Sequence, residues 1–537
     1  MRASALAIAL LAAPLAPPSP PAAPPLPGAA SPPAAPPLPA PAPPPDTVAS
    51  LRAAAEAAIV KAKARAMTGS AVVNEVTLPS IERLVQDADA RAAKATNPGR
   101  DDAFVRKNLE TARTFAIQVA AGEDPYRSAT GMVIKAYRAD WDGTLQPYAL
   151  YVPREYKPGR PGGWPLVVAL HGALSDHRHN LRRVFGLDNR RGESDAEASR
   201  NELALPDVQA LVVSPYARGE IMGYDGLGGD DVMRVIEDVR RAYDVDPDRI
   251  SITGLSMGGG GAWQLGLRHP ELFAAIAPVC GVADLTHWLQ PQDAAFYDVA
   301  ALEAESPLAL ADKAIGREVF IFHGAKDPIV PVVQSRRMVE RYRALGWLDK
   351  NVHYTEYPNV DHAAWTPAYK DAALLRTLAS IKRSKAALNA AVPAGAGRVI
   401  PGLFGKSIPR QQPHIYVYDS KGAPEAVAAA RALATALADW GPMVAARFTV
   451  KADTDVTADD RARFGIVRVA IAATTGTHIG PPAGDQGMRT LTTDAAGRVT
   501  LKLTARTARG FEKLRRFARP NRDSWYPEPN RPVIVVD

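Results

Sequence analysis

The stretch of residues 249–262, RISITGLSMGGGGA, constrains the fold of this chain more than any other. Residues 250–253 have β-type character, and a helix-compatible segment follows Gly258. A serine at the apex of a tight strand-to-helix turn has a strained backbone, and the turn closes only if the residues two before and two after it lack bulk. Gly254 and Gly258 meet that requirement. The pattern therefore predicts an accessible hydroxyl at the start of a helix, and Ser256 is the candidate nucleophile.

Apolar segments of strand length alternate with helical segments downstream of residue 131. The expected strands cover residues 132–137, 146–152, 165–170, 210–214, 250–253, 274–279, 318–323 and 352–357. Buried strands that alternate with helices predict a mostly parallel sheet covered by helices on both faces. Ligands of such sheets bind at the carboxyl ends of the strands.

The partners of Ser256 are expected after later strands, in the chain order Ser, Asp or Glu, His. Asp327 follows the seventh of these strands and His362 follows the eighth. His362 would take the Ser256 proton and return it to the leaving group, while Asp327 would orient the imidazole and stabilise its cation. These three residues are the predicted catalytic triad.

The third strand ends at a His-Gly pair, residues 171–172, whose loop can direct backbone N–H groups toward the serine. We expect the N–H of Ala173 or Leu174, together with that of Met257, to bind the oxyanion of a tetrahedral intermediate.

Other residues compete with these assignments. Asp284 or Asp361 is an alternative to Asp327 for the acid, since an isolated loop aspartate is often a turn former. His177 and His179 have the spacing of a metal pair, although a solvated loop is the expected interpretation.

Together, several motifs resemble a known superfamily: LHG at 170–172, DVDPDRI at 244–250 leading into GLSMG at 254–258, HGAKDPIVP at 323–331 and HAAWTPAY at 362–369. The resemblance is to the α/β-hydrolases and covers about residues 131–385. Within them the motifs are most similar to the secreted esterase branch of feruloyl esterases, acetylxylan esterases and polyhydroxyalkanoate depolymerases, with prolyl oligopeptidase-like peptidases as neighbours.

This resemblance implies a triad of Ser256, Asp327 and His362 that hydrolyses its substrate through an acyl-enzyme, with no metal and no organic cofactor. Several enzymes of the branch are braced by disulfides, whereas this chain has one cysteine, Cys280. The departure favours a general carboxylesterase over a polymer depolymerase.

We therefore predict a serine carboxylic ester hydrolase whose substrate is an ester, such as a plant or microbial polysaccharide ester or a polyester. A prolyl oligopeptidase-like peptidase is the alternative enzyme, because the same triad cleaves amides. A non-catalytic binding or scaffolding protein on this fold is the alternative from another class. Four side chains are candidates for the substrate pocket: Tyr216, Arg218, Trp288 and Trp365.

The segments on either side suggest additions to the catalytic domain. Residues 1–30 resemble a signal peptide and 31–46 a Pro/Ala-rich linker, so a secreted or periplasmic protein is expected, with a cytoplasmic protein bearing a disordered arm as the alternative. Residues 47–121 are expected to form three helices. Residues 391–537 are expected to form an α/β to β-rich accessory region that either extends the main sheet or stands as its own unit.

Charge and hydropathy exclude two classes of partner. The net charge is +7, but basic residues are interspersed with acidic ones along the chain, so no nucleic acid is expected as a ligand. The N-terminal apolar run is too short to span a membrane, and no membrane span is expected.

Overall fold

The computed structural model describes residues 47–66, 73–93, 98–199, 204–224, 226–288, 303–383, 413–439, 444–471, 487–493, 499–505, 507–517 and 533–536. The predicted signal peptide and Pro/Ala-rich linker lie outside these residues. None of the helices in the described ranges combines the length and the apolar character that crossing a membrane requires.

Three helices precede the sheet: α1 (Val48–Ala66), α2 (Leu78–Ala92) and α3 (Pro98–Ala120), with a short π-helix, η1 (Val73–Thr77), before α2. Small side chains fill the contacts between them, because the alanines that face inward are fully buried and let the backbones approach closely. The Ser80 hydroxyl ties α2 to the sheet, since it accepts the Ala136 N–H at 2.9 Å.

The central sheet has eight strands in the order β1-β2-β4-β3-β5-β6-β7-β8. They are β1 (Gly131–Arg138), β2 (Leu145–Val152), β3 (Trp164–Leu170), β4 (Leu211–Pro215), β5 (Val245–Leu255), β6 (Ala275–Val279), β7 (Glu318–Gly324) and β8 (Val352–Tyr357). The pairs of β2 with β1 and with β4 are antiparallel, and every other pair is parallel. The predicted mostly parallel sheet is confirmed.

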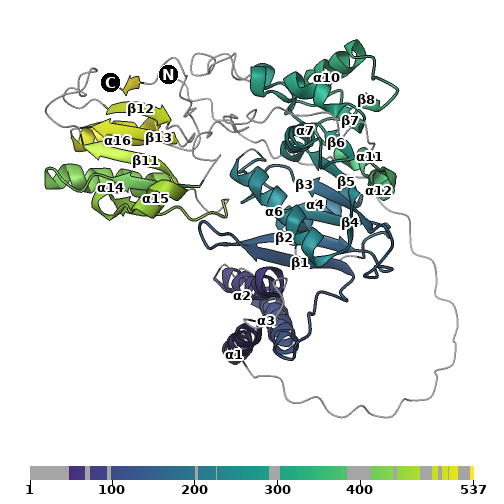
Figure 1. The fold of residues 1–537 in the computed structure, drawn as a ribbon, viewed down its shortest axis with the longest axis horizontal. Helices are drawn as coiled ribbons and strands as arrows, with labels where there is room; N and C mark the ends of the chain where they lie inside the picture. Colours follow the sequence, from purple (N-terminus) through teal and green to yellow (C-terminus); the bar gives the residue numbers. More distant parts are fainter. Residues whose placement is uncertain are drawn as a thin grey trace. The chain divides into compact units, whose positions relative to one another are not determined.

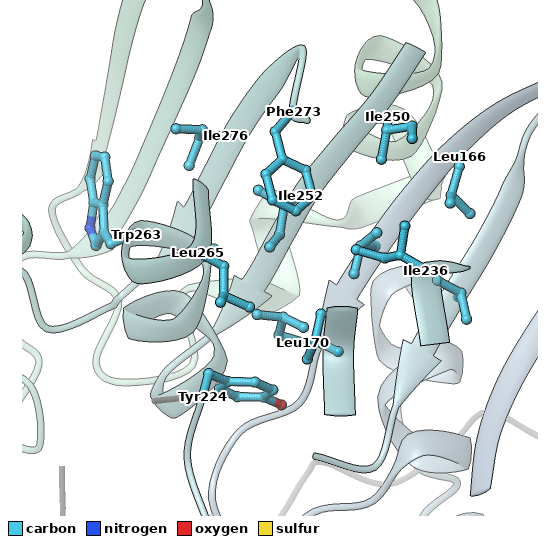
Figure 2. Packing of buried hydrophobic residues seen from close by; sticks show 14 of the residues in the cluster. Leu166, Leu170, Tyr224, Ile236, Ile250, Ile252, Trp263, Leu265, Phe273 and Ile276 are labelled. Carbon is cyan, nitrogen blue, oxygen red and sulfur yellow. The ribbon is translucent and has the colours of Figure 1, made fainter. Parts of the chain in front are cut away.

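Helices cover both faces of this sheet (Figure 1). Helices α6 (Leu227–Ala242), α7 (Met257–Arg268) and α10 (Val333–Ala344) pack over one apolar cluster, part of which Figure 2 shows. Helices α4 (His177–Val184) and α12 (Ala373–Ser380) pack over a second cluster on the opposite face, because strand side chains alternate between the two. The shorter helices are α5 (Asp195–Ala198), α8 (Leu285–Trp288), η3 (Pro307–Ala314), α11 (Trp365–Ala368) and η4 (Lys370–Ala372).

The sequence of α6 explains which face it buries. Val232, Val235, Ile236 and Val239 recur at helical spacing and are all almost completely buried against the sheet. Ile236 is among the side chains labelled in Figure 2, where it lies in the same cluster as Leu166 and Ile250 of the neighbouring strands.

The C-terminal region has a separate six-stranded mixed sheet in the order β10-β9-β11-β13-β12-β14, so the alternative that it extends the central sheet is wrong. Its elements are β9 (His414–Tyr418), α14 (Pro424–Ala438), β10 (Val450–Ala452), η5 (Asp453–Asp455), α15 (Ala458–Arg463), β11 (Gly465–Ile471), β12 (Gly487–Thr493), β13 (Val499–Ala505), α16 (Ala508–Phe517) and β14 (Val533–Val536). Phe511 and Leu514 of α16 are buried in its core, as their helical spacing predicts.

Candidate active site

Ser256 lies at the apex of the turn between β5 and α7. Its backbone has φ 54° and ψ −116°, and its N–H donates to the Val279 carbonyl at 2.9 Å. A Cβ atom at Gly254 would collide with the Gly258 carbonyl, and one at Gly258 would collide with the Leu170 carbonyl. Both glycines are therefore required for the strained turn to close, which is the steric reason for the motif.

The structure brings the three predicted triad residues into one hydrogen-bonded chain. His362 Nε2 lies 2.9 Å from Ser256 Oγ, and His362 Nδ1 lies 2.8 Å from Asp327 Oδ2. The other carboxylate oxygen of Asp327 accepts the N–H groups of Ile329 and Val330, each at 2.9 Å. Asp327 is thus held by its own loop in the orientation that meets the imidazole.

The two alternative acids are engaged elsewhere. Asp284 accepts hydrogen bonds from the Thr286 hydroxyl at 2.6 Å and the Thr286 N–H at 3.0 Å, so it closes its own turn. Asp361 accepts the Ala363 N–H at 3.0 Å. Within the described residues neither carboxylate forms a hydrogen bond with His362, so Asp327 is the carboxylate partner of His362.

The electrostatics of Asp327 suit a group that stabilises an imidazolium. Burial by itself would raise the pKa of this carboxyl, but hydrogen bonds from His323 and His362 and from the Val330 N–H outweigh it and hold the pKa well below its usual range. A lowered pKa favours the ionised form of Asp327, which can stabilise a protonated His362. The His362 side chain keeps 19% of its surface exposed, so a substrate can reach it.

The structure reduces the number of backbone N–H groups that can bind the oxyanion. The Leu174 N–H donates to the Glu220 carbonyl at 2.9 Å, so the expectation that Leu174 binds the oxyanion is wrong. Glu220 lies in the loop between β4 and α6, so the Leu174 N–H is already engaged in a hydrogen bond to that loop. Within the described residues no acceptor is recorded for the N–H of Ala173 or of Met257, and both follow segments that meet at the serine, since a Cβ at Gly172 would lie 3.6 Å from Ser256 Cβ. The N–H groups of Ala173 and Met257 are therefore the remaining candidates for binding the oxyanion.

Two of the four expected pocket residues lie at or next to the site. The Trp365 ring stands edge-on to the His362 ring, with centroids 5.2 Å apart. Tyr216 packs against the rings of His171 and His177, and its carbonyl lies 3.1 Å from His171 Nε2. Tyr216 follows β4 and Trp365 comes after β8, so both residues lie beyond the carboxyl end of a strand of the central sheet.

The other two pocket residues are placed differently. Arg218 is only 4% exposed and pairs with Asp142 at 3.2 Å, while its guanidinium covers the Trp141 ring, so its expected role in this pocket is wrong. A buried arginine needs a buried counter-charge, and Asp142 in the hairpin turn supplies it. Trp288 ends α8, where its N–H donates to the Asp284 carbonyl at 3.1 Å.

Two exposed apolar side chains lie on the loops of the site, and neither of them was assigned to the substrate pocket from the sequence. Leu174 is 46% exposed and adopts φ 63°, and Ile329 is 58% exposed two residues after Asp327. A branched residue at positive φ is strained, and strain of this kind is concentrated at functional loops. The signal that could have identified both is an apolar residue immediately beside a catalytic motif.

The ligand atoms of Cys280, Asp327 and His362 lie within 4.8 Å of one another, which raises the question of a metal site. Both imidazole nitrogens already take part in hydrogen bonds to Ser256 and Asp327. Burial raises the pKa of the Cys280 thiol well above its usual range, and its Sγ–H donates to the His362 carbonyl at 3.4 Å. A protonated thiol and an engaged imidazole do not suit a metal ion.

The two histidines of the 177–179 segment also differ from expectation. They lie in the first turn of α4 and are buried, so the solvated-loop interpretation is wrong. The Asp176 carboxylate caps this helix by accepting the N–H of His179 at 2.8 Å. The ring of His179 pairs with Asn189 at 2.9 Å, which makes it a structural residue.

Comparison with known proteins agrees with this architecture. The prolyl oligopeptidase family matches residues 226–384. An uncharacterized peptidase of Bacillus subtilis (strain 168), YuxL, is 29% identical over 26% of this chain and 22% of its own length. Esterase LipQ of Mycobacterium tuberculosis is 33% identical over 25% of this chain and 38% of its own length. The chain thus spans well under half of either relative.

Among solved structures, a thermostable esterase is 25% identical, with a TM-score of 0.32, over 47% of this chain and 63% of its own. The order and direction of the strands and the strand-turn-helix around Ser256 are those of an α/β-hydrolase fold. The chain has the α/β-hydrolase fold, and over part of its length it is similar to serine hydrolases of the prolyl oligopeptidase and esterase types.

Proposed function

We propose that this protein hydrolyses carboxylic esters through an acyl-enzyme formed on Ser256. The observation that carries the proposal is the unbroken chain from Ser256 Oγ through the imidazole of His362 to the carboxylate of Asp327, with contacts of 2.9 and 2.8 Å. A serine hydroxyl is a weak nucleophile, and this arrangement supplies the base that it needs.

The chemistry follows from the positions of the hydrogens. His362 Nδ1 carries a proton toward Asp327, so Nε2 is free to accept the Ser256 proton as Oγ attacks the carbonyl carbon. The oxyanion that develops faces the N–H groups of Ala173 and Met257. The imidazolium then protonates the leaving alcohol, and a water activated by the same nitrogen releases the acid.

Support for an ester over a peptide comes from the surroundings of the triad. Leu174 and Ile329, on two loops, and Trp365, at the start of α11, present apolar surface near the triad, as an alkyl or aryl ester requires. A peptidase is the second candidate, because the prolyl oligopeptidase family matches the segment from α6 to the end of the sheet domain. Polysaccharide esters and polyesters remain proposed natural substrates.

A substrate panel on the full-length protein tests the proposal. It should contain p-nitrophenyl acetate, butyrate and octanoate, a feruloylated sugar, a polyester film and an Ala-Pro p-nitroanilide, with Ser256→Ala as the inactive control. We expect ester turnover that Ser256→Ala abolishes. An anilide rate above every ester rate would favour the peptidase, and equal rates for the wild type and Ser256→Ala would favour the non-catalytic alternative.

We also propose that the protein is exported, and the support is the sequence of its first 30 residues. Expression of the full chain in a Gram-negative host, followed by fractionation and N-terminal sequencing, tests this. A processed N-terminus in the periplasm or medium is expected. Retention of Met1 on protein confined to the cytoplasm would contradict it.

A further inference from the structure

A second histidine lies against the carboxylate of the triad. His323, in β7, has no exposed surface, and its Nε2 lies 3.3 Å from Asp327 Oδ2 and 2.8 Å from the Val330 carbonyl. Its Nδ1 lies 2.7 Å from the hydroxyl of Ser335, which is buried at the start of α10.

The partners of His323 determine where its proton lies. The Val330 carbonyl and the Asp327 carboxylate can only accept hydrogen bonds, so Nε2 carries the hydrogen that both share. The Ser335 hydroxyl then donates to Nδ1. This tautomer gives both ring nitrogens of His323 a partner without placing a further charge in the core, where charge is costly.

The contact makes Asp327 a fully bonded carboxylate. Its Oδ1 accepts two backbone N–H groups, and its Oδ2 faces the N–H groups of His362 and His323 from two sides. A carboxylate with donors on one oxygen only can rock about its Cβ–Cγ bond. Here the second imidazole limits that motion, and it also connects the acid loop to α10 through Ser335.

We propose that His323, held by Ser335, is a positioning residue that keeps Asp327 Oδ2 directed at His362. It does not touch the substrate and acts through the aspartate, as supporting residues around catalytic groups do. The inference rests on the proposed function, because it concerns the same hydroxyl–imidazole–carboxylate chain. It goes beyond that function in assigning catalytic support to a residue whose alternative role is to brace its loop.

Two substitutions at His323 separate positioning from bracing. Glutamine can place an amide N–H close to the position of Nε2, whereas leucine fills similar volume with no donor. Turnover of p-nitrophenyl acetate by the full-length protein should be expressed per active serine, counted by fluorophosphonate labelling. We expect His323→Leu to lower kcat by about tenfold to a hundredfold with little change in KM, because a hydrogen bond to an ionised group is lost. His323→Gln should recover most of that loss.

The same measurement of kcat per labelled serine is applied to a control variant. His353→Leu removes a histidine from the neighbouring strand β8, where it pairs with Glu318 at 3.0 Å, and should leave kcat unchanged. A folded His323→Leu with wild-type kcat per labelled serine overturns the proposal, as does equal loss in His323→Leu and His323→Gln.

If His323→Leu does not fold, Ser335→Ala carries the test, with a smaller fall in kcat expected and an unchanged kcat refuting the inference. Failure of the proposed function would look different, because the activity of Ser256→Ala would then equal that of the wild type.

Discussion

Replacing Asp327 by asparagine is expected to stop catalysis while leaving the fold intact. Oδ1 accepts two backbone N–H groups, so the amide oxygen must occupy that position. The amide NH₂ is then forced to face His362 Nδ1, 2.8 Å away in the native site. Two donors cannot share that contact, so the imidazole moves its proton to Nε2 and presents a donor to Ser256. A base in the wrong tautomer lowers kcat by about 10⁴-fold, about 5 kcal/mol in the activation barrier.

The measurement is kcat for p-nitrophenyl acetate, with circular dichroism to verify folding. Asp361→Asn is a matched control, because Asp361 adjoins His362 in sequence and its carboxylate accepts the Ala363 N–H, a role that an asparagine oxygen can fill. We expect the control to stay within about threefold of the wild type, as substitutions outside such a site usually do. A kcat for Asp327→Asn within about tenfold of the wild type would refute the tautomer argument.

Three further outcomes are expected. Gly258→Ala should lose more than about a hundredfold in kcat, because its Cβ would meet the Leu170 carbonyl and displace the serine turn; near-normal kinetics would contradict the steric argument. Burial raises the pKa of the Asp231 carboxyl to about 6, so its charge destabilises the fold above that pH, and stability should rise as pH falls from 7 to 5. In urea titrations Asp231→Asn should lose part of that slope, because burial also raises the pKa of the Asp238 carboxyl to about 6; an unchanged slope would contradict the contribution of Asp231. Ile329→Ala should lower kcat/KM for the octanoate ester by about tenfold and spare the acetate, since its side chain is 58% exposed on the acid loop; equal effects on both esters would exclude it from the chain-binding surface.

Prediction from sequence succeeds where local physics is decisive. The alternation of strands and helices follows from side-chain period, and all eight strands of the central sheet lie where the apolar runs place them. The beginning of β5 was missed, because residues 245–249 join the strand only through pairing with Trp164 on β3. In the C-terminal region β12 was missed as well, since its two larger apolar residues, Met488 and Leu491, are three positions apart and do not show the alternation of a strand.

The candidate site divides in the same way. The sequence could identify the triad of Ser256, Asp327 and His362, because each residue follows a strand. The carboxyl ends of parallel strands lie at one edge of the sheet, where the three side chains can meet. The sequence could not predict the hydrogen bond from Leu174 to Glu220 or the ion pair of Arg218 with Asp142. In each pair the two residues lie on loops that are far apart in the sequence. The contact of His323 with Asp327 spans four residues, but its geometry depends on Ser335 in the next helix.

The amino-acid sequence alone determined that a serine would stand on a glycine-flanked turn, because steric exclusion of Cβ atoms acts within a few residues. The sequence also determined which types of side chain follow the carboxyl ends of the parallel strands. Only the tertiary structure decided which backbone donors stay free, which charges are neutralised and what surrounds the aspartate. Those outcomes depend on which loops meet in space, and hydrogen bonds between loops are selected by the packing of the sheet and not by the residues next to them.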